Sequence, residues 1–98
     1  MKIGYVYMMA SYKRGTIYTG MTSDLVSRVW QHKTEANDGF TKKHSVKRLV
    51  WFEDFERMID AIAYEKRLKK YKRIWKIELI ERANPEWREM HPESGLFI

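Results

Sequence analysis

The sequence predicts an α/β domain of the α+β kind, in which helices flank a small three-stranded antiparallel sheet in the order β-β-α-β-α-α. Two runs rich in β-branched and aromatic residues, 4–10 and 16–20, enclose a short polar turn and indicate a hairpin. A third run of this kind, 46–52, indicates the third strand. The segments 57–71 and 72–83 have helical patterns and complete the order. Because 98 residues can build one compact domain but not two, we expect a single domain over residues 1–98.

The hairpin is expected to bring two tyrosines together. A turn centred near residues 12 and 13 pairs the first two strands in antiparallel fashion, which places Tyr7 close to Tyr18. Gly20 then allows a sharp exit from the second strand. If the first strand lies between the other two, the whole sheet is antiparallel, and the helix that joins the second strand to the third covers one of its faces.

The first helix is predicted from about residue 24 to residue 34. Any of the polar residues 22–24 can cap its free N–H groups. Apolar residues recur along it at helical spacing: Leu25, Val26, Val29 and Trp30. Arg28 and His32 are four residues apart and therefore share one side of the helix. A strand-borne phenol beside a helix-borne arginine and histidine is a candidate phosphate site.

The remaining segments are predicted to be connections or ends. Residues 35–44 are polar and indicate an exposed loop. Asn84 and Pro85 should end the last helix, because the residue before a proline avoids the helical region. After Pro85 we expect a short turn and a loose tail, so that the core covers about residues 3–87 and the C-terminal tail covers residues 88–98.

Composition and charge narrow the class of protein. Lysine and arginine outnumber aspartate and glutamate by 19 to 13, and a net charge of +6 favours a polyanionic partner, with nucleic acid as the first candidate. The absence of cysteine excludes disulfides and thiolate chemistry. No apolar run approaches the roughly 20 residues that span a bilayer, and the N-terminus has no signal-peptide pattern. We therefore expect a cytoplasmic protein with no membrane partner.

Glu65 carries the clearest signal of a polar site. It lies in the middle of the apolar stripe of the helix 57–71, which is formed by Met58, Ala61, Ile62 and Leu68. A carboxylate there must be paired, neutralised or bound to a metal, since burying it alone costs several kcal/mol. Two interpretations stay open. Glu65 could help to hold a hard cation such as Mg²⁺ together with water and substrate phosphate, or it could form a structural ion pair with Arg28 or a lysine.

Seven cations and no acidic residue lie between positions 66 and 76: Lys66, Arg67, Lys69, Lys70, Lys72, Arg73 and Lys76. A solvated helix face usually intersperses acids with its cations, so this cluster favours a phosphate-contacting surface, with a merely solvated face as the alternative. A second basic patch lies near the third strand at residues 42–48. The four tryptophans could stack on bases, but their spacing fits core packing better.

Taken together, these residues resemble the GIY-YIG nuclease superfamily. Tyr5-Val6-Tyr7 is followed eleven residues later by Tyr18-Thr19-Gly20, then by an arginine ten residues on and a histidine four beyond, and a later helix carries Glu65. The segments Glu65-Lys66-Arg67-Leu68-Lys69-Lys70 and Asn84-Pro85-Glu86-Trp87 are also similar to small bacterial proteins of the UPF0213 type. The resemblance covers roughly residues 3–87, and five elements in the right order make a specific match.

The resemblance implies a three-stranded sheet flanked by helices. It also implies an endonuclease that hydrolyses phosphodiester bonds in DNA with the help of a metal ion. Such an enzyme is expected to recognise DNA structure rather than sequence and to act in DNA repair or processing. The implied cofactor is Mg²⁺ or Mn²⁺. Carried over by position, Tyr7 and Tyr18 are the motif tyrosines, Arg28 binds phosphate, His32 holds the helix position of a His or Tyr, and Glu65 is the metal ligand. Asn84 matches the late asparagine of some members.

Some features depart from the family pattern. Tyr5 replaces the usual glycine of the first motif, and Met21 stands where repair-type members often carry lysine. A second DNA-recognition domain is also not expected. These departures support the alternative of a nucleic-acid-binding module that keeps the fold and the basic surface but cleaves weakly or not at all.

Overall fold

A computed structural model describes residues 1–34 and 45–98 of the chain, so the loop predicted at residues 35–44 lies outside the described residues. Its centre is a sheet of three strands: β1 (Gly4–Ala10), β2 (Ile17–Thr22) and β3 (Arg48–Phe55). The strand order is β2-β1-β3, and both strand pairs are antiparallel. The predicted central position of the first strand is therefore confirmed.

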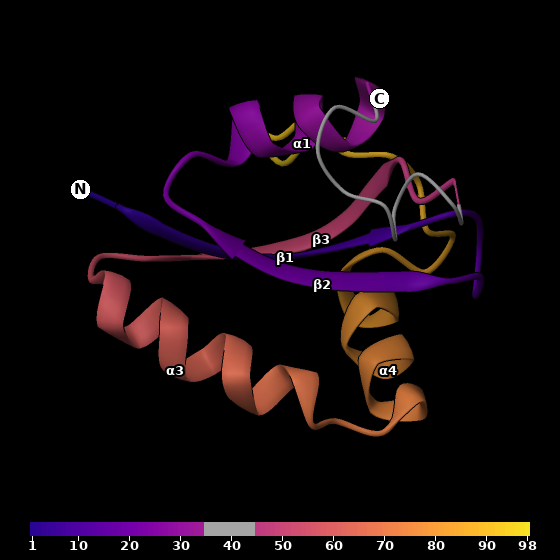
Figure 1. Ribbon diagram of the computed structural model, residues 1–98. Helices are drawn as coiled ribbons and strands as arrows, with labels where there is room; N and C mark the ends of the chain where they lie inside the picture. The colour runs from indigo at the N-terminus through magenta and orange to yellow at the C-terminus, as the bar shows by residue number, and fades with distance from the viewer. Residues whose placement is uncertain (35–44) are drawn as a thin grey trace.

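In the described part of the chain, three helices cover the two faces of this sheet: α1 (Leu25–Thr34), α3 (Met58–Lys69) and α4 (Arg73–Ala83). Figure 1 shows α1 on one face and α3 with α4 on the other. The element order β-β-α-β-α-α and the α+β class are as the sequence predicts. Among the residues that the structure describes, no helix is both long enough and apolar enough to cross a membrane.

The core has two halves because successive side chains of a strand point to opposite faces of the sheet. The half under α1 contains Tyr7, Met9, Leu25, Val29, Val46 and Leu49. The half on the side of α3 and α4 contains Val6, Met8, Ala10, Val50, Trp51, Ala61, Leu68, Ile80 and Trp87. Met21, at the position where lysine is common in repair-type members, packs at the edge of this second half. Its side chain thus serves packing on the face away from α1.

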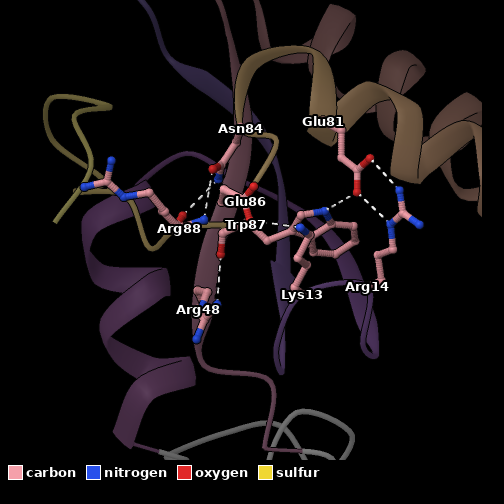
Figure 2. A network of polar contacts seen from close by, with 8 residues as sticks. All are labelled: Lys13, Arg14, Arg48, Glu81, Asn84, Glu86, Trp87 and Arg88. Carbon is pink, nitrogen blue, oxygen red and sulfur yellow. Dashed lines mark hydrogen bonds and ion pairs between the residues drawn. The ribbon is translucent and has the colours of Figure 1, made fainter.

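The segment that follows α4 is held to the sheet, and the predicted loose tail is wrong (Figure 2). Trp87 is completely buried, its indole N–H donates to Glu81 at 2.7 Å, and its carbonyl accepts from Arg48 at 3.0 Å. The Met90 N–H donates to the Leu49 carbonyl at 2.9 Å, so the chain continues along β3. The contacts with Arg48 and Leu49 join residues about 40 positions apart in sequence, which local patterns do not reveal.

The tryptophans divide between core and surface. Trp51 and Trp87 are buried, as expected, but Trp30 is 62% exposed on α1 and Trp75 is 47% exposed on α4. The expectation of core packing is therefore wrong for Trp30 and Trp75. Helical spacing identifies an apolar stripe but does not tell how wide a part of it the sheet covers.

Candidate active site

The β1–β2 hairpin places the two motif tyrosines side by side, as predicted. Tyr7 pairs with Gly20 across the ladder, and Tyr18 pairs with Met9. Residues two positions apart on the paired strands share a face of the sheet, so both phenols point to the side of α1. Their ring centroids lie 6.2 Å apart.

Gly20 makes room for the Tyr7 phenol. A Cβ added to residue 20 would lie 2.6 Å from the Tyr7 hydroxyl oxygen and 2.7 Å from its Cζ. No real side chain carbon approaches other atoms so closely, and the Tyr7 ring is fully buried with little freedom to move away. The glycine of the second motif is thus required by the close approach of a phenol to the backbone of β2.

The start of α1 is fixed by Asp24, one of the three capping residues that the sequence offers. Its Oδ1 accepts from the Ser27 N–H at 3.1 Å and its Oδ2 accepts from the Ser27 hydroxyl at 2.8 Å. The backbone hydrogen bond first, and then the hydroxyl, lower the pKa of the Asp24 carboxyl. A charged cap at the positive end of the helix dipole favours the same start, and this start decides which way Arg28 and His32 point.

Arg28 and His32 both contact the hydroxyl of Tyr7. The Arg28 Nε donates to this oxygen at 3.2 Å, and the His32 Nε2 lies 2.9 Å from it. The Tyr18 ring lies 5.0 Å from the His32 ring, centroid to centroid. Tyr7 is fully buried and His32 is 3% exposed. The structure thus brings four predicted site residues into one cluster under α1.

The hydrogen-bond directions within this cluster follow from the chemistry of the groups. A guanidinium can only donate, so the Tyr7 oxygen accepts from Arg28. A neutral His32 protonated on Nδ1 can then accept the Tyr7 proton on Nε2, so that the Tyr7 hydroxyl accepts one hydrogen bond and donates another. The hydrogen bond to Tyr7, and to a smaller extent the neighbouring Tyr18, raise the pKa of Arg28 above its already high ordinary value. The cation is therefore permanent.

Gln31 joins the cluster through Arg28, whose Nη1 donates to its amide oxygen at 3.3 Å. Gln31 follows Arg28 by three positions on a helix, and side chains at this spacing are neighbours, so the spacing could have predicted this contact. The sequence alone gave Gln31 no such role.

Glu65 lies apart from these contacts on α3, which packs against the opposite face of the sheet (Figure 1). Its side chain is only 16% exposed, and the carboxylate forms an ion pair with Lys69 at 2.9 Å. Of the two interpretations of Glu65, the ion pair with a lysine is the one that the structure contains. The role of Glu65 as metal ligand stays a prediction.

The donor set that could hold a metal is small. Within residues 1–34 and 45–98, no three His, Asp or Glu side chains are gathered closely enough to bind a metal ion. A single hard carboxylate nevertheless fits the way Mg²⁺ is held when water and substrate phosphates complete its coordination. Glu65 fits this minimal role, since it is mostly buried and its partner Lys69 is a flexible, half-exposed side chain that can move aside.

The basic cluster, residues 66–76, surrounds the turn from α3 to α4, and part of it is occupied by internal contacts. Arg73 donates from Nη2 to the carbonyls of Arg14 and Gly15 in the hairpin turn, at 2.5 and 2.7 Å. Lys69 pairs with Glu65. Burial, followed by repulsion from Lys69 and Arg73, lowers the pKa of Lys76. Lys66 and Lys70 are exposed members of the cluster.

Asn84 is buried and its side-chain amide is fully used by backbone groups (Figure 2). The Nδ2 donates to the carbonyls of Val50 at 3.0 Å and Arg88 at 2.9 Å, and the Oδ1 accepts from the Arg88 N–H at 2.9 Å. Asn84 thus fastens the C-terminal segment to β3. Its match to the late asparagine of the family stays a prediction.

Comparison with known proteins finds relatives of similar size. The chain is 33% identical over 94 residues to a UPF0213 protein of Clostridium perfringens, and the match covers 96% of this chain and 100% of the relative. It is 32% identical over 77 residues to a UPF0213 protein of Haloquadratum walsbyi, covering 79% of this chain and 85% of the relative. A UPF0213 protein of Pediococcus pentosaceus is 28% identical over 79 residues, and the match covers 81% of this chain and 83% of the relative. No solved structure matches.

The GIY-YIG catalytic domain matches residues 3–78. This range contains both motif tyrosines, Arg28, His32 and Glu65, and it spans all three strands of the sheet. With these motifs, this fold and relatives that match over nearly their whole length, the chain belongs to the GIY-YIG family of nuclease domains and is of the UPF0213 type.

Proposed function

We propose that this protein is a metal-dependent endonuclease that hydrolyses phosphodiester bonds in DNA, selects its substrate by DNA structure, and serves DNA repair or processing in the cytoplasm. One observation carries the proposal: the Tyr7 hydroxyl lies between the Arg28 guanidinium and the His32 imidazole, at 3.2 and 2.9 Å. A phenol that has a permanent cation on one side and a proton acceptor on the other is arranged to lose its proton.

In this proposal Tyr7 is the general base. Its proton moves to the His32 Nε2, and the resulting phenolate is stabilised by Arg28 and takes a proton from the attacking water. Tyr18 orients the water or the phosphate. A guanidinium has five N–H donors, so the contacts of Arg28 with Tyr7 and Gln31 leave it able to bind phosphate oxygens.

Glu65 would hold the divalent cation, Mg²⁺ or Mn²⁺, which would offset negative charge on the phosphate oxygens. Because α3 lies on the face of the sheet opposite to α1, this role requires the DNA backbone to contact both faces. To bind the metal, the Glu65 carboxylate must give up its ion pair with Lys69. An i,i+4 ion pair on a helix contributes about 0.3–0.5 kcal/mol, and Lys69 is half-exposed, so the exchange costs little. Lys69 would then join the other cations of the basic cluster.

The basic cluster supports nucleic acid as the substrate. The chain carries a net charge of +6. Burial lowers the pKa of Lys76, and repulsion from the nearby Lys69 and Arg73 adds to this effect. A polyanion relieves such repulsion and releases its own counterions when it binds. The cluster is therefore the proposed surface for the phosphate backbone.

The alternative is a nucleic-acid-binding module without substantial cleavage. Two observations favour it: Tyr7 is fully buried, and Glu65 is engaged by Lys69. Under this alternative the Tyr7, Arg28 and His32 contacts hold α1 on the sheet, and the basic cluster alone performs the function.

A cleavage screen separates the two functions. Branched, flapped, duplex and single-stranded DNA are incubated with the protein in Mg²⁺, in Mn²⁺ and with a chelator. The proposal predicts nicking that needs the metal and is faster on branched or flapped DNA than on plain duplex. Salt-sensitive binding of all substrates without any metal-dependent nicking would support the binding module instead.

A further inference from the structure

A hollow of about 360 Å³ lies between α3 and α4, away from the cluster under α1. Three aromatic residues, two charged residues and a leucine line it: Tyr64, Tyr71, Trp75, Glu78, Leu79 and Arg82. The two helices that line it lie on the face of the sheet opposite to α1 (Figure 1). The proposed active site makes no use of these residues.

The aromatic walls of the hollow are held in place. The Tyr64 ring stacks on the Trp51 ring, with 6.3 Å between the ring centroids and an angle of 16° between the planes. Its centroid lies 5.5 Å from that of the Phe55 ring. Tyr71 meets Trp75 edge to face at 5.6 Å. Trp75 is nevertheless 47% exposed, which is unusual for a side chain so large and apolar. The hollow therefore offers fixed aromatic surface to a flat ligand.

Cations lie over the same rings. The Arg67 guanidinium is 5.3 Å from the Tyr64 centroid, and the Lys72 ammonium is 5.6 Å from the Trp75 centroid. Arg82 can donate to a ring carbonyl or nitrogen, and Glu78 can accept from an exocyclic amino group. Burial raises the pKa of the Tyr64 hydroxyl, so Tyr64 brings no negative charge to the hollow at neutral pH.

We propose that this hollow binds an unpaired nucleobase, which stacks on Trp75 while the adjacent phosphates contact Lys72 and Arg67. A stacking aromatic ring, polar groups for a base edge and flanking cations together match a nucleotide of a single strand. Lys72 is flexible and exposed, so it can leave the Trp75 ring for a phosphate when the base arrives. An uncharged apolar ligand would not need these cations.

This inference rests on the proposed action on nucleic acid and narrows the substrate to DNA with a single-stranded segment. The hollow and the cluster under α1 are on opposite faces of a domain with extents of 30 × 29 × 25 Å. A strand several nucleotides long is needed to reach both. Flaps, overhangs and branched junctions supply such a strand, whereas a blunt duplex does not.

The test compares two probes on the full chain with Glu65→Gln in every protein, so that cleavage does not consume the DNA. One probe is a duplex with a single-stranded overhang that carries 2-aminopurine, whose fluorescence falls on stacking, and the other is the same duplex with blunt ends. Trp75→Ala is the test variant, and Trp75→Phe keeps a ring. Trp30→Ala is the matched control, because Trp30 is also an exposed tryptophan but lies on α1.

The expected result is that Trp75→Ala weakens overhang binding about tenfold or more, within the range of one base–aromatic stack, and abolishes the fluorescence decrease. Trp75→Phe should retain most of both, Trp30→Ala should match the parent, and blunt-duplex affinity should not change. Thermal melting checks that each variant is folded. Equal overhang affinity for Trp75→Ala and Trp30→Ala overturns the inference but leaves the proposed function intact. If the parent binds neither probe, the proposed function fails as well.

Discussion

Tyr7 and Gly20 face each other across the β1–β2 ladder, and the Tyr7 phenol occupies the space that a Cβ on residue 20 would need. The second motif glycine and the first motif tyrosine are therefore one packing unit. This unit holds the Tyr7 hydroxyl where Arg28 and His32 can reach it, at 3.2 and 2.9 Å.

Gly20→Ala should displace the Tyr7 ring, because the new Cβ would lie 2.6 Å from the hydroxyl oxygen. Overpacking of this kind typically costs about 1–3 kcal/mol of stability. The proposed base would also lose its alignment with His32, so cleavage should fall even in the folded protein. Denaturant unfolding gives the stability, and NMR shifts of the His32 ring report the contact. Unchanged stability with unchanged His32 shifts would contradict this packing relationship.

Much of the active-site geometry could be predicted because its rules are local. A short polar turn fixes the strand register, and the register brings Tyr7 to Tyr18. Helical spacing places Arg28 and His32 on one side of α1. The contact of both with the single oxygen of Tyr7 depends on how α1 packs on the sheet, and the sequence does not predict it.

Long-range packing could not be predicted in the same way. Trp87 is buried because Glu81, Arg48 and the contacts of Asn84 hold the C-terminal segment on the sheet. Trp30 and Trp75 sit on apolar stripes, yet the sheet covers only part of each stripe. The position of Glu65 on an apolar stripe was compatible with either a metal ligand or an ion pair. Only the folded structure shows that its carboxylate contacts Lys69.

Nucleic acid binding through the basic cluster predicts a defined salt dependence. With about four phosphate contacts, the logarithm of duplex affinity should fall with the logarithm of salt at a slope near −3.6. Neutralising the exposed Lys66 and Lys70 with glutamine should flatten the slope by about 1.8, or 0.9 for each lost contact. Lys2→Gln with Lys13→Gln removes the same charge elsewhere and should leave the slope close to that of the wild type. Equal slopes for the two double variants would move the binding surface to another part of the chain.

The hairpin turn should loosen in acid. The hydrogen bonds from Arg14 and from the Trp87 indole lower the pKa of Glu81 to about 2. A carboxyl whose pKa is lower in the folded than in the unfolded protein stabilises the fold at any pH above its unfolded pKa. This stability is lost as the pH falls through the folded pKa. The melting temperature should therefore decline between about pH 4.5 and pH 2. Glu81→Gln should start lower at pH 7 and decline less over this window; parallel curves for the two proteins would remove Glu81 from the acid response.

Glu65→Gln separates a metal ligand from a structural ion pair. The pair with Lys69 is of the i,i+4 type with Lys69 half-exposed, so losing it should cost less than about 1 kcal/mol. Cleavage should disappear while DNA binding persists, because the amide cannot replace the carboxylate at a divalent ion. Lys69→Met is the control, since it breaks the same ion pair but leaves the carboxylate in place. If Lys69→Met loses cleavage to the same extent as Glu65→Gln, the pair rather than a metal explains the effect.

The central claim is that the Tyr7 oxygen takes part in hydrolysis, and the single-turnover cleavage rate of Tyr7→Phe on flapped DNA in Mg²⁺ tests it most directly. Removing this oxygen leaves Arg28 and His32 without their shared partner, at a stability cost of about 1–3 kcal/mol, so rates are compared at a temperature where both proteins are folded. The exposed Tyr12→Phe is the matched control. We expect a rate about 10²–10⁴-fold lower for Tyr7→Phe, with DNA affinity and the Tyr12→Phe rate unchanged. A Tyr7→Phe protein that cleaves at the wild-type rate would contradict the account.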